Sequence, residues 1–171
     1  MKIAVIGFGA AAIGFLHKMK NTDAEIHVYE KSKDIFSSSI SGIRADGKLF
    51  VSKEMGGDID VDIALQKQLV DFYINSLKEK KVETGSSFTN KTYYKTFYEK
   101  GFQPIISDFY HIGTDQLKEV LFNIFEEFKT HKNIKFFFNS EIKDVDVIAN
   151  KVLLDKTYGN YSGAFEDSIT L

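Results

Sequence analysis

The feature that most constrains this chain is a pair of glycines between a short apolar run and a helical stretch. Residues 2–6 (KIAVI) have the character of a buried strand, Ala10–Lys20 has the pattern of an amphipathic helix, and Gly7 and Gly9 stand between them. Glu25–Tyr29 (EIHVY) indicates a second strand. Strand, helix and strand in this order form a βαβ unit, which predicts a parallel sheet.

The junction has the pattern G-x-G-x-x-A, and each fixed position has a physical task. Gly7 permits a tight turn, Gly9 lets the backbone approach a pyrophosphate, and Ala12 is small enough for the helix to lie close to the sheet. The first N–H groups of a helix and its dipole also favour a phosphate. The candidate phosphate-binding residues are Gly7, Phe8, Gly9, Ala10, Ala11 and Ala12.

An acidic residue stands where this fold recognises a ribose. Glu30 ends the second strand and lies 21 residues after Gly9. Its carboxylate can accept hydrogen bonds from ribose hydroxyls and would repel a 2′-phosphate, which disfavours NADP. Lys31 reduces that repulsion and is a candidate contact as well. The alternative is that the two glycines only shape a tight turn in an α/β sheet.

Composition narrows the class of protein. The 171 residues suit one domain, and a net charge of −2 gives no field that would gather nucleic acid or a membrane surface, so neither is an expected partner. The absence of cysteine excludes disulfides, thiolate zinc sites and a redox-active dithiol. No apolar stretch is long enough to cross a membrane, and the start of the chain does not resemble a signal peptide, so the expected location is the cytoplasm.

The remainder of the chain alternates between helical and strand patterns. Ser37–Gly57 is rich in serine and glycine and is predicted to be an ordered loop. The predicted helices are Val61–Lys81, Asn90–Lys100 and a helix from Thr114 or Asp115 to Lys129, and the predicted strands are Gln103–Tyr110, Ile134–Phe138, Glu141–Val147, Lys151–Asp155 and Asp167–Leu171.

Other residues that could carry chemistry lack suitable partners. The four histidines are scattered, and a packing or surface role is favoured for His17 and His27. The alternating Asp58, Asp60 and Asp62 lack the remaining ligands of a calcium loop, so no metal site is predicted. Aromatic residues interleaved with lysines over 91–102 could stack on bases, but at helical spacing they more simply form one apolar face.

Three segments resemble a family of FAD-dependent dehydrogenases that are distant relatives of the glutathione-reductase-type flavoproteins. Gly42–Leu49 (GIRADGKL), with Gly56 and Gly57 downstream, resembles that family's G-x-x-S-D-G-K-L loop. His111–Leu117 (HIGTDQL), followed by a helix and the strand at Ile134, resembles its H-I-G-T-D segment. The three blocks, counting the glycine motif, keep the family's order and approximate spacing over nearly the whole chain.

The resemblance implies a Rossmann-like FAD/NAD(P)-binding α/β domain spanning 1–171, with a loop and helical insertion over about 37–110 and a small β-hairpin. It also implies that FAD is the cofactor, that Asp46, Gly47 and Lys48 approach the pyrophosphate or the flavin, and that backbone near Ile142 meets the adenine. The family's second domain is missing, so we expect an N-terminal portion of a flavin-dependent oxidoreductase that is not catalytically complete, with catalytic residues and substrate unassigned. The alternative is a non-catalytic module that binds NAD or FAD, and the sequence leaves a homo-oligomer open.

Overall fold

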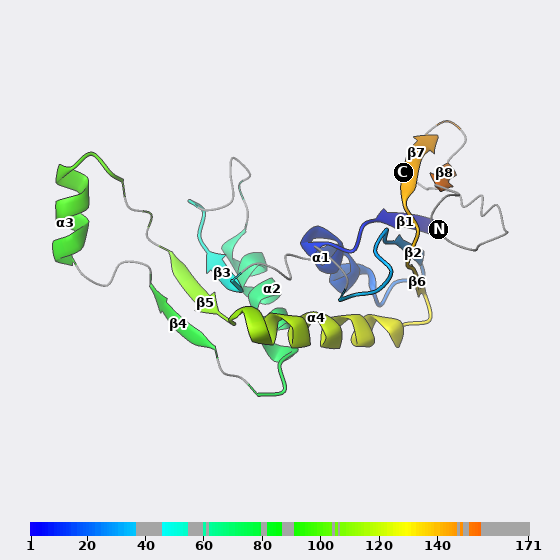
Figure 1. Ribbon diagram of the computed structural model, residues 1–171, viewed down its shortest axis with the longest axis horizontal. Coiled ribbons are helices and arrows are strands. Elements are labelled where there is room, and N and C mark those ends of the chain that lie inside the picture. Colours follow the sequence, from blue (N-terminus) through cyan, green and yellow to red (C-terminus); the bar gives the residue numbers. More distant parts are fainter. Residues whose placement is uncertain are drawn as a thin grey trace. The chain divides into compact units, whose positions relative to one another are not determined.

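The computed structural model in Figure 1 describes residues 1–36, 46–54, 60, 62–79, 82–86, 91–103, 105, 107–146, 148 and 151–154. The chain divides into two compact units, here called the first unit (Met1–Arg44 with Leu121–Leu171) and the second unit (Ala45–Val120). Part of the predicted insertion over about 37–110 falls in the second unit, and the assignment of one domain to the whole chain stays a prediction. Within the described residues, no helix combines the length and apolar character needed to cross a membrane.

The first unit contains the predicted βαβ arrangement. Strands β1 (Lys2–Ile6), β2 (Glu25–Tyr29) and β6 (Ile134–Phe137) form a parallel sheet in the order β1-β2-β6, and helix α1 (Ala10–Met19) connects the first two. Because the strands are parallel and in register, the carboxyl ends of β1 and β2 lie side by side, with Ile6 opposite Tyr29. The sheet therefore brings the glycine turn and the residues after β2 to one edge.

The core of the first unit lies between this sheet and the helices. Ile26 and Val28 of β2 are fully buried, as expected for a strand covered on both faces. The helices contribute Ala12, Ile13 and Leu16 of α1 and Leu121, Ile124 and Phe128 of α4 (Thr114–Lys129). Phe15 of α1 is apolar too, but its side chain is 38% exposed.

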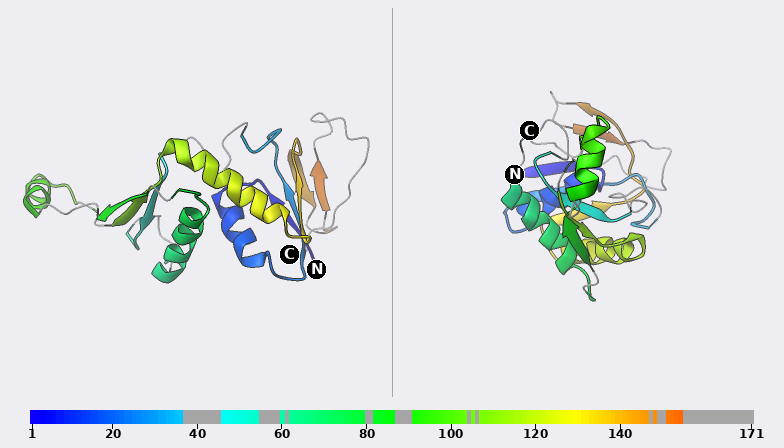
Figure 2. Two further views of the ribbon diagram at one scale, coloured as in Figure 1. Left: turned by 90° about the horizontal axis from the view of Figure 1, so that it is seen from below. Right: turned by 90° about the vertical axis from the view of Figure 1, so that its left-hand side faces the viewer.

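A small antiparallel hairpin completes the first unit. Strands β7 (Ile142–Asp146) and β8 (Lys151–Leu154) pair with each other in antiparallel fashion. They are the orange strands that lie side by side in Figures 1 and 2. Tyr29 and Val152 are buried together, with Ile142 packed against them. The predicted hairpin is confirmed, and its packing brings Ile142 to the end of β2.

The described residues of the second unit form a three-stranded antiparallel sheet, two helices and the first turns of α4. Strands β3 (Lys48–Val51) and β4 (Glu83–Ser86) both pair with β5 (Asp108–His111), giving the order β3-β5-β4. The helices are α2 (Ile63–Asn75) and α3 (Lys91–Glu99), and the first turns of α4 also belong here.

Several predictions for the second unit need correction. The loop predicted over Ser37–Gly57 contains strand β3, while residues 37–45 and 55–57 lie outside the described residues. Helix α2 begins after Asp62, whose carboxylate caps it by accepting a hydrogen bond from the Ala64 amide at 2.7 Å, and it ends earlier than predicted. Strand β5 starts at Asp108, later than predicted. In the first unit, the predicted strand Asp167–Leu171 lies outside the described residues and stays a prediction.

A candidate dinucleotide site in the first unit

The turn between β1 and α1 is formed by two glycines with different conformations. Gly7 has a φ of +82°, which L side chains rarely adopt, and its N–H donates to the Tyr29 carbonyl at 2.7 Å. Gly9 is the N-cap of α1 and has an extended conformation, with a φ of −94° that any residue can adopt. The backbone thus requires glycine at the first position and not at the second.

Packing does not require glycine at the second position either. A Cβ added to Gly9 would meet, beyond its neighbours in the chain, no atom of the described residues within 4 Å. No side chain caps α1 at Gly9, and the first turn of this helix contains no acidic residue. An open space in front of a glycine and the first N–H groups of a helix are features that an anion site requires.

The carboxylate of Glu30 is buried and closely held. Oε2 accepts a hydrogen bond from the Phe8 N–H at 2.9 Å, and Oε1 accepts from the Ser32 N–H at 2.9 Å and the Ser32 hydroxyl at 2.7 Å. Burial acts to raise the pKa of Glu30, but these hydrogen bonds, with the nearby Lys31 charge, outweigh burial and lower the pKa from its ordinary value. Glu30 is therefore ionised at neutral pH, and its carboxylate ties the glycine turn to the end of β2.

The side chain of Phe8 points away from the glycine turn into the core. Its ring is fully buried and contacts Phe136 edge-on, with ring centroids 5.1 Å apart, and also Phe125 and Phe128. Only the backbone of Phe8 is thus available to a ligand, and its N–H already donates to Glu30. The ring anchors the turn, which reduces the ordering that ligand binding would otherwise require.

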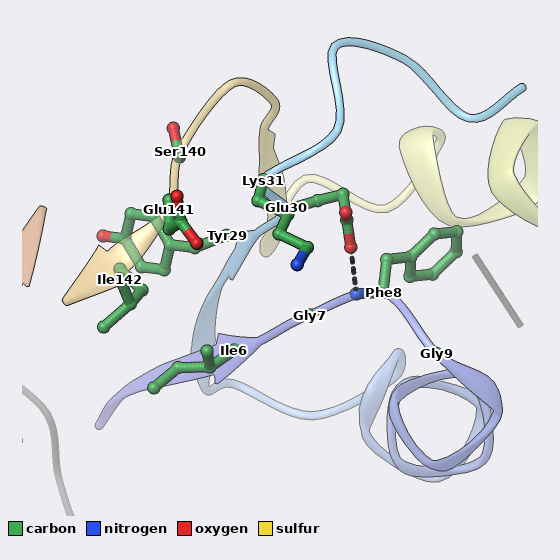
Figure 3. A pocket seen from close by; sticks show the side chains of 10 residues that line it. All are labelled: Ile6, Gly7, Phe8, Gly9, Tyr29, Glu30, Lys31, Ser140, Glu141 and Ile142. Carbon is green, nitrogen blue, oxygen red and sulfur yellow. Dashed lines mark hydrogen bonds between the residues drawn. The ribbon is translucent and has the colours of Figure 1, made fainter. Parts of the chain in front are cut away.

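A pocket of about 270 Å³ opens between the glycine turn and the start of β7. This volume is near the lower end of small-molecule sites, roughly 300 Å³, and suits part of a dinucleotide better than a whole one. Figure 3 shows Tyr29, Glu141 and Ile142 gathered at one end and the Glu30–Phe8 hydrogen bond at the other. The lining residues are Ile6, Gly7, Phe8, Gly9, Tyr29, Glu30, Lys31, Ser140, Glu141 and Ile142.

Half of the predicted site residues line this pocket. Gly7, Phe8, Gly9, Glu30, Lys31 and Ile142 line the pocket, and Ala10, Ala11 and Ala12 form the first turn of α1. Sequence reasoning missed Ile6, Tyr29, Ser140 and Glu141. The first two are the last residues of β1 and β2, so the rule that ligands bind at the carboxyl ends of parallel strands could have found them.

Asp46, Gly47 and Lys48 belong to the second unit, and their predicted approach to a cofactor stays a prediction. Gly47 has a φ of +72°, and a Cβ placed on it would be 3.0 Å from the Gly113 nitrogen. The Gly47 carbonyl accepts a hydrogen bond from the Ile112 N–H at 2.9 Å. Lys48 forms an ion pair with Asp46 at 2.7 Å. The structure therefore joins the two motifs that carry the resemblance, although they are far apart in the sequence.

Known structures share the fold of this chain. It matches a variant of 2-methyl-3-hydroxypyridine-5-carboxylic acid oxygenase with a TM-score of 0.51 and 14% identity, over 92% of this chain and 36% of that chain. A tetrameric form of the same oxygenase gives 0.50 and 13% over the same shares. A variant of P. aeruginosa PqsL gives 0.52 and 8%, over 91% of this chain and 39% of that chain. No protein-family model and no curated protein sequence matches.

These identities are low, so the likeness shows the fold alone. With the parallel sheet of the first unit and the antiparallel sheet of the second, the chain has a mixed α/β fold of the Rossmann-like FAD/NAD-binding type. It spans only 36–39% of the length of the three structures named above.

Proposed function

We propose that the first unit binds the adenosine-diphosphate half of FAD. The observation that carries the proposal is Gly9, because neither its backbone conformation nor its packing explains a glycine there. A pyrophosphate lying against the backbone does explain it, since a side chain at Gly9 would occupy the space of the phosphates.

The lining of the pocket suits the parts of such a nucleotide. The pyrophosphate would lie at Gly7, Gly9 and the first turn of α1, where N–H groups and the positive end of the helix dipole stabilise it. Glu30 would accept a hydrogen bond from the ribose. The adenine would lie at the apolar end, near Tyr29 and Ile142.

FAD is favoured over NAD by the kind of protein that shares the fold. The named matches include an oxygenase, and of the two dinucleotides only the flavin carries out chemistry with O₂. The resemblance of the Gly42–Leu49 and His111–Leu117 segments to FAD-dependent dehydrogenases supports the same cofactor. When bound, a flavin supplies the hydride and electron transfer, and the protein supplies binding and orientation.

We further propose that the chain acts as the cofactor-binding portion of a flavin-dependent oxidoreductase. In that setting Asp46, Gly47 and Lys48 would contact the cofactor. Gly47 packs closely against the backbone of Gly113. Assembly of several copies is a further proposal, prompted by the tetrameric form of the matched oxygenase. Catalytic residues and the substrate are not assigned.

The test compares FAD, NAD and NADP by thermal shift, together with flavin absorbance of the protein after gel filtration. FAD should raise the melting temperature most, because a ligand that binds only the folded state stabilises it. A larger shift with NAD would favour a non-catalytic NAD-binding module instead. Glu30→Ala should weaken FAD binding by roughly 1.5–3 kcal/mol, whereas unchanged affinity would remove Glu30 from the site.

A further inference from the structure

Only part of the hydrogen-bonding capacity of the Glu30 carboxylate is available to a ligand, because protein donors already use the rest. We propose that Glu30 binds only one of the two ribose hydroxyls and that Ser32 is the positioning residue that makes it do so. This inference rests on the proposed nucleotide site and states how that site recognises the sugar.

The first oxygen of the carboxylate is fully used by Ser32. A carboxylate oxygen accepts about two hydrogen bonds, because it has two lone-pair directions. Oε1 of Glu30 accepts from the Ser32 hydroxyl at 2.7 Å and from the Ser32 N–H at 2.9 Å. Both donors come from one residue two positions along the chain, so neither has to move when a ligand enters. Oε1 therefore has no lone pair left for a ribose.

The second oxygen has room for one donor. Oε2 accepts the Phe8 N–H at 2.9 Å, and no other hydrogen bond reaches it from the described residues. The Phe8 ring is fully buried among aromatic rings, so its backbone stays in place. One acceptor direction thus remains, on the oxygen nearer the glycine turn, where Figure 3 shows the hydrogen bond to Phe8.

Because they are buried, the hydrogen bonds from Ser32 to Glu30 are difficult to replace by hydrogen bonds to water or to a ligand. Ser32 is 9% exposed and Glu30 is 7% exposed, so water cannot readily replace a lost partner. A ribose hydroxyl that displaced the Ser32 hydroxyl would have to break a buried hydrogen bond of 2.7 Å to a charged acceptor. The favourable complex keeps all three protein hydrogen bonds and adds one from the ligand.

The first experiment measures binding of ADP, 2′-deoxy-ADP and 3′-deoxy-ADP to the whole chain by calorimetric titration. One deoxy analogue should bind about 10- to 100-fold more weakly than ADP, since it lacks a hydrogen bond to a charged group. The other should bind within about threefold of ADP. Equal losses for both analogues, or no loss for either, would overturn the inference while leaving the nucleotide site intact. No binding of ADP at all would overturn both.

The second experiment repeats the three titrations on Ser32→Ala. Removing the Ser32 hydroxyl opens one acceptor direction on Oε1 of Glu30. The ribose hydroxyl whose loss did not change the affinity of the wild-type protein should therefore contribute to binding in this variant. The affinity of this variant for the deoxy analogue that lacks that ribose hydroxyl should be at least about threefold lower than its affinity for ADP. Ser32→Thr keeps a hydroxyl and should restore the wild-type pattern.

A merely structural role of Ser32 would weaken all three ligands in proportion and leave their ratios unchanged, which would overturn its assignment as a positioning residue. Thr22→Ala is the matched control. It removes a hydroxyl that donates to the Met19 carbonyl at the far end of α1, and it should leave the three affinities in their wild-type ratio. A changed ratio in this control would show that any lost hydroxyl alters recognition, which contradicts a specific role for Ser32.

Discussion

The molecule builds the same local arrangement twice, once in each unit. In the first unit, β1 leads through Gly7 into α1; in the second, β5 leads through Gly113 into α4. The two glycines have nearly the same backbone conformation, with φ values of +82° and +84°. The turns differ in length, because Gly7 precedes the N-cap Gly9 of α1 whereas Gly113 stands directly before the first residue of α4, and they differ in their surroundings.

The second turn is completed by the protein itself. The backbone of Gly47 packs against Gly113, and Asp115 places a negative charge in the first turn of α4. At the first turn, no acidic residue lies in the first turn of α1. A Cβ placed on Gly9 or on Gly113 would meet, beyond its neighbours in the chain, no described residue within 4 Å, so what sets the second turn apart is the close approach of Gly47 to the Gly113 backbone. A strand, a glycine and a helix therefore do not by themselves form an anion site. An open space in front of the helix and a first helical turn without an acidic residue also favour an anion.

The closed packing of the second turn is tested most strongly at Gly47. Gly47→Ala combines a strained positive φ with a Cβ only 3.0–3.2 Å from the Gly113 backbone. Strain and overpacking together should lower the free energy of unfolding by about 2–5 kcal/mol. Urea unfolding followed by circular dichroism measures this loss. A loss under about 1 kcal/mol would show that the two backbones separate easily.

The contribution of Glu30 to the free energy of unfolding, through its hydrogen bond to the turn between β1 and α1, should depend on pH. Glu30→Gln replaces an acceptor with a group that donates toward Phe8 or Ser32, so it should cost about 1.5–3 kcal/mol of stability at neutral pH. Since the pKa of Glu30 is lowered in the folded protein, the unfolded chain binds more protons on acidification.

The advantage of the wild-type protein over Glu30→Gln should therefore be full above the ordinary pKa of 4.5 and shrink as the pH falls below it. Urea unfolding of both proteins across this range provides the measurement. A difference that stays constant, or grows in acid, would mean that the carboxylate does not stabilise the turn as an anion.

A smaller effect is expected at Gly7, where only the backbone conformation is at stake. Gly7→Ala introduces a residue at a φ of +82° with no atom within 4 Å of its Cβ. The cost should be about 1–2 kcal/mol, clearly less than for Gly47→Ala. Parallel denaturation of the two variants measures the difference, and equal losses would remove the contrast between an open and a closed turn.

Much of the first unit could be predicted because its signals are local. The β1 and β2 boundaries follow from apolar runs, and α1 follows from its periodicity and the glycines before it. Convergence of Gly9, Glu30 and Ile142 on one pocket follows from parallel strands ending at one edge.

The second unit was harder to predict because its sheet depends on distant pairing. Strand β3 lies within a serine- and glycine-rich stretch and pairs with β5, which follows much later in the chain. Strand β4 (ETGS) contains no large apolar residue at all. Such short strands are defined by their partners rather than by their own propensity. The Ser32 hydrogen bonds to Glu30 were missed for a similar reason, since side-chain geometry leaves no pattern in the sequence.

The smallest effect on stability is expected at Gly9, and this position tests the central claim most directly. Gly9→Ser gives α1 a preferred N-cap without strain, so the free energy of unfolding should stay equal or rise by a few tenths of a kcal/mol. Calorimetric titration with FAD should nevertheless show an affinity at least about tenfold lower, because the side chain occupies the space of the pyrophosphate. Wild-type affinity for FAD in this variant would contradict the claim that the space at Gly9 holds a dinucleotide.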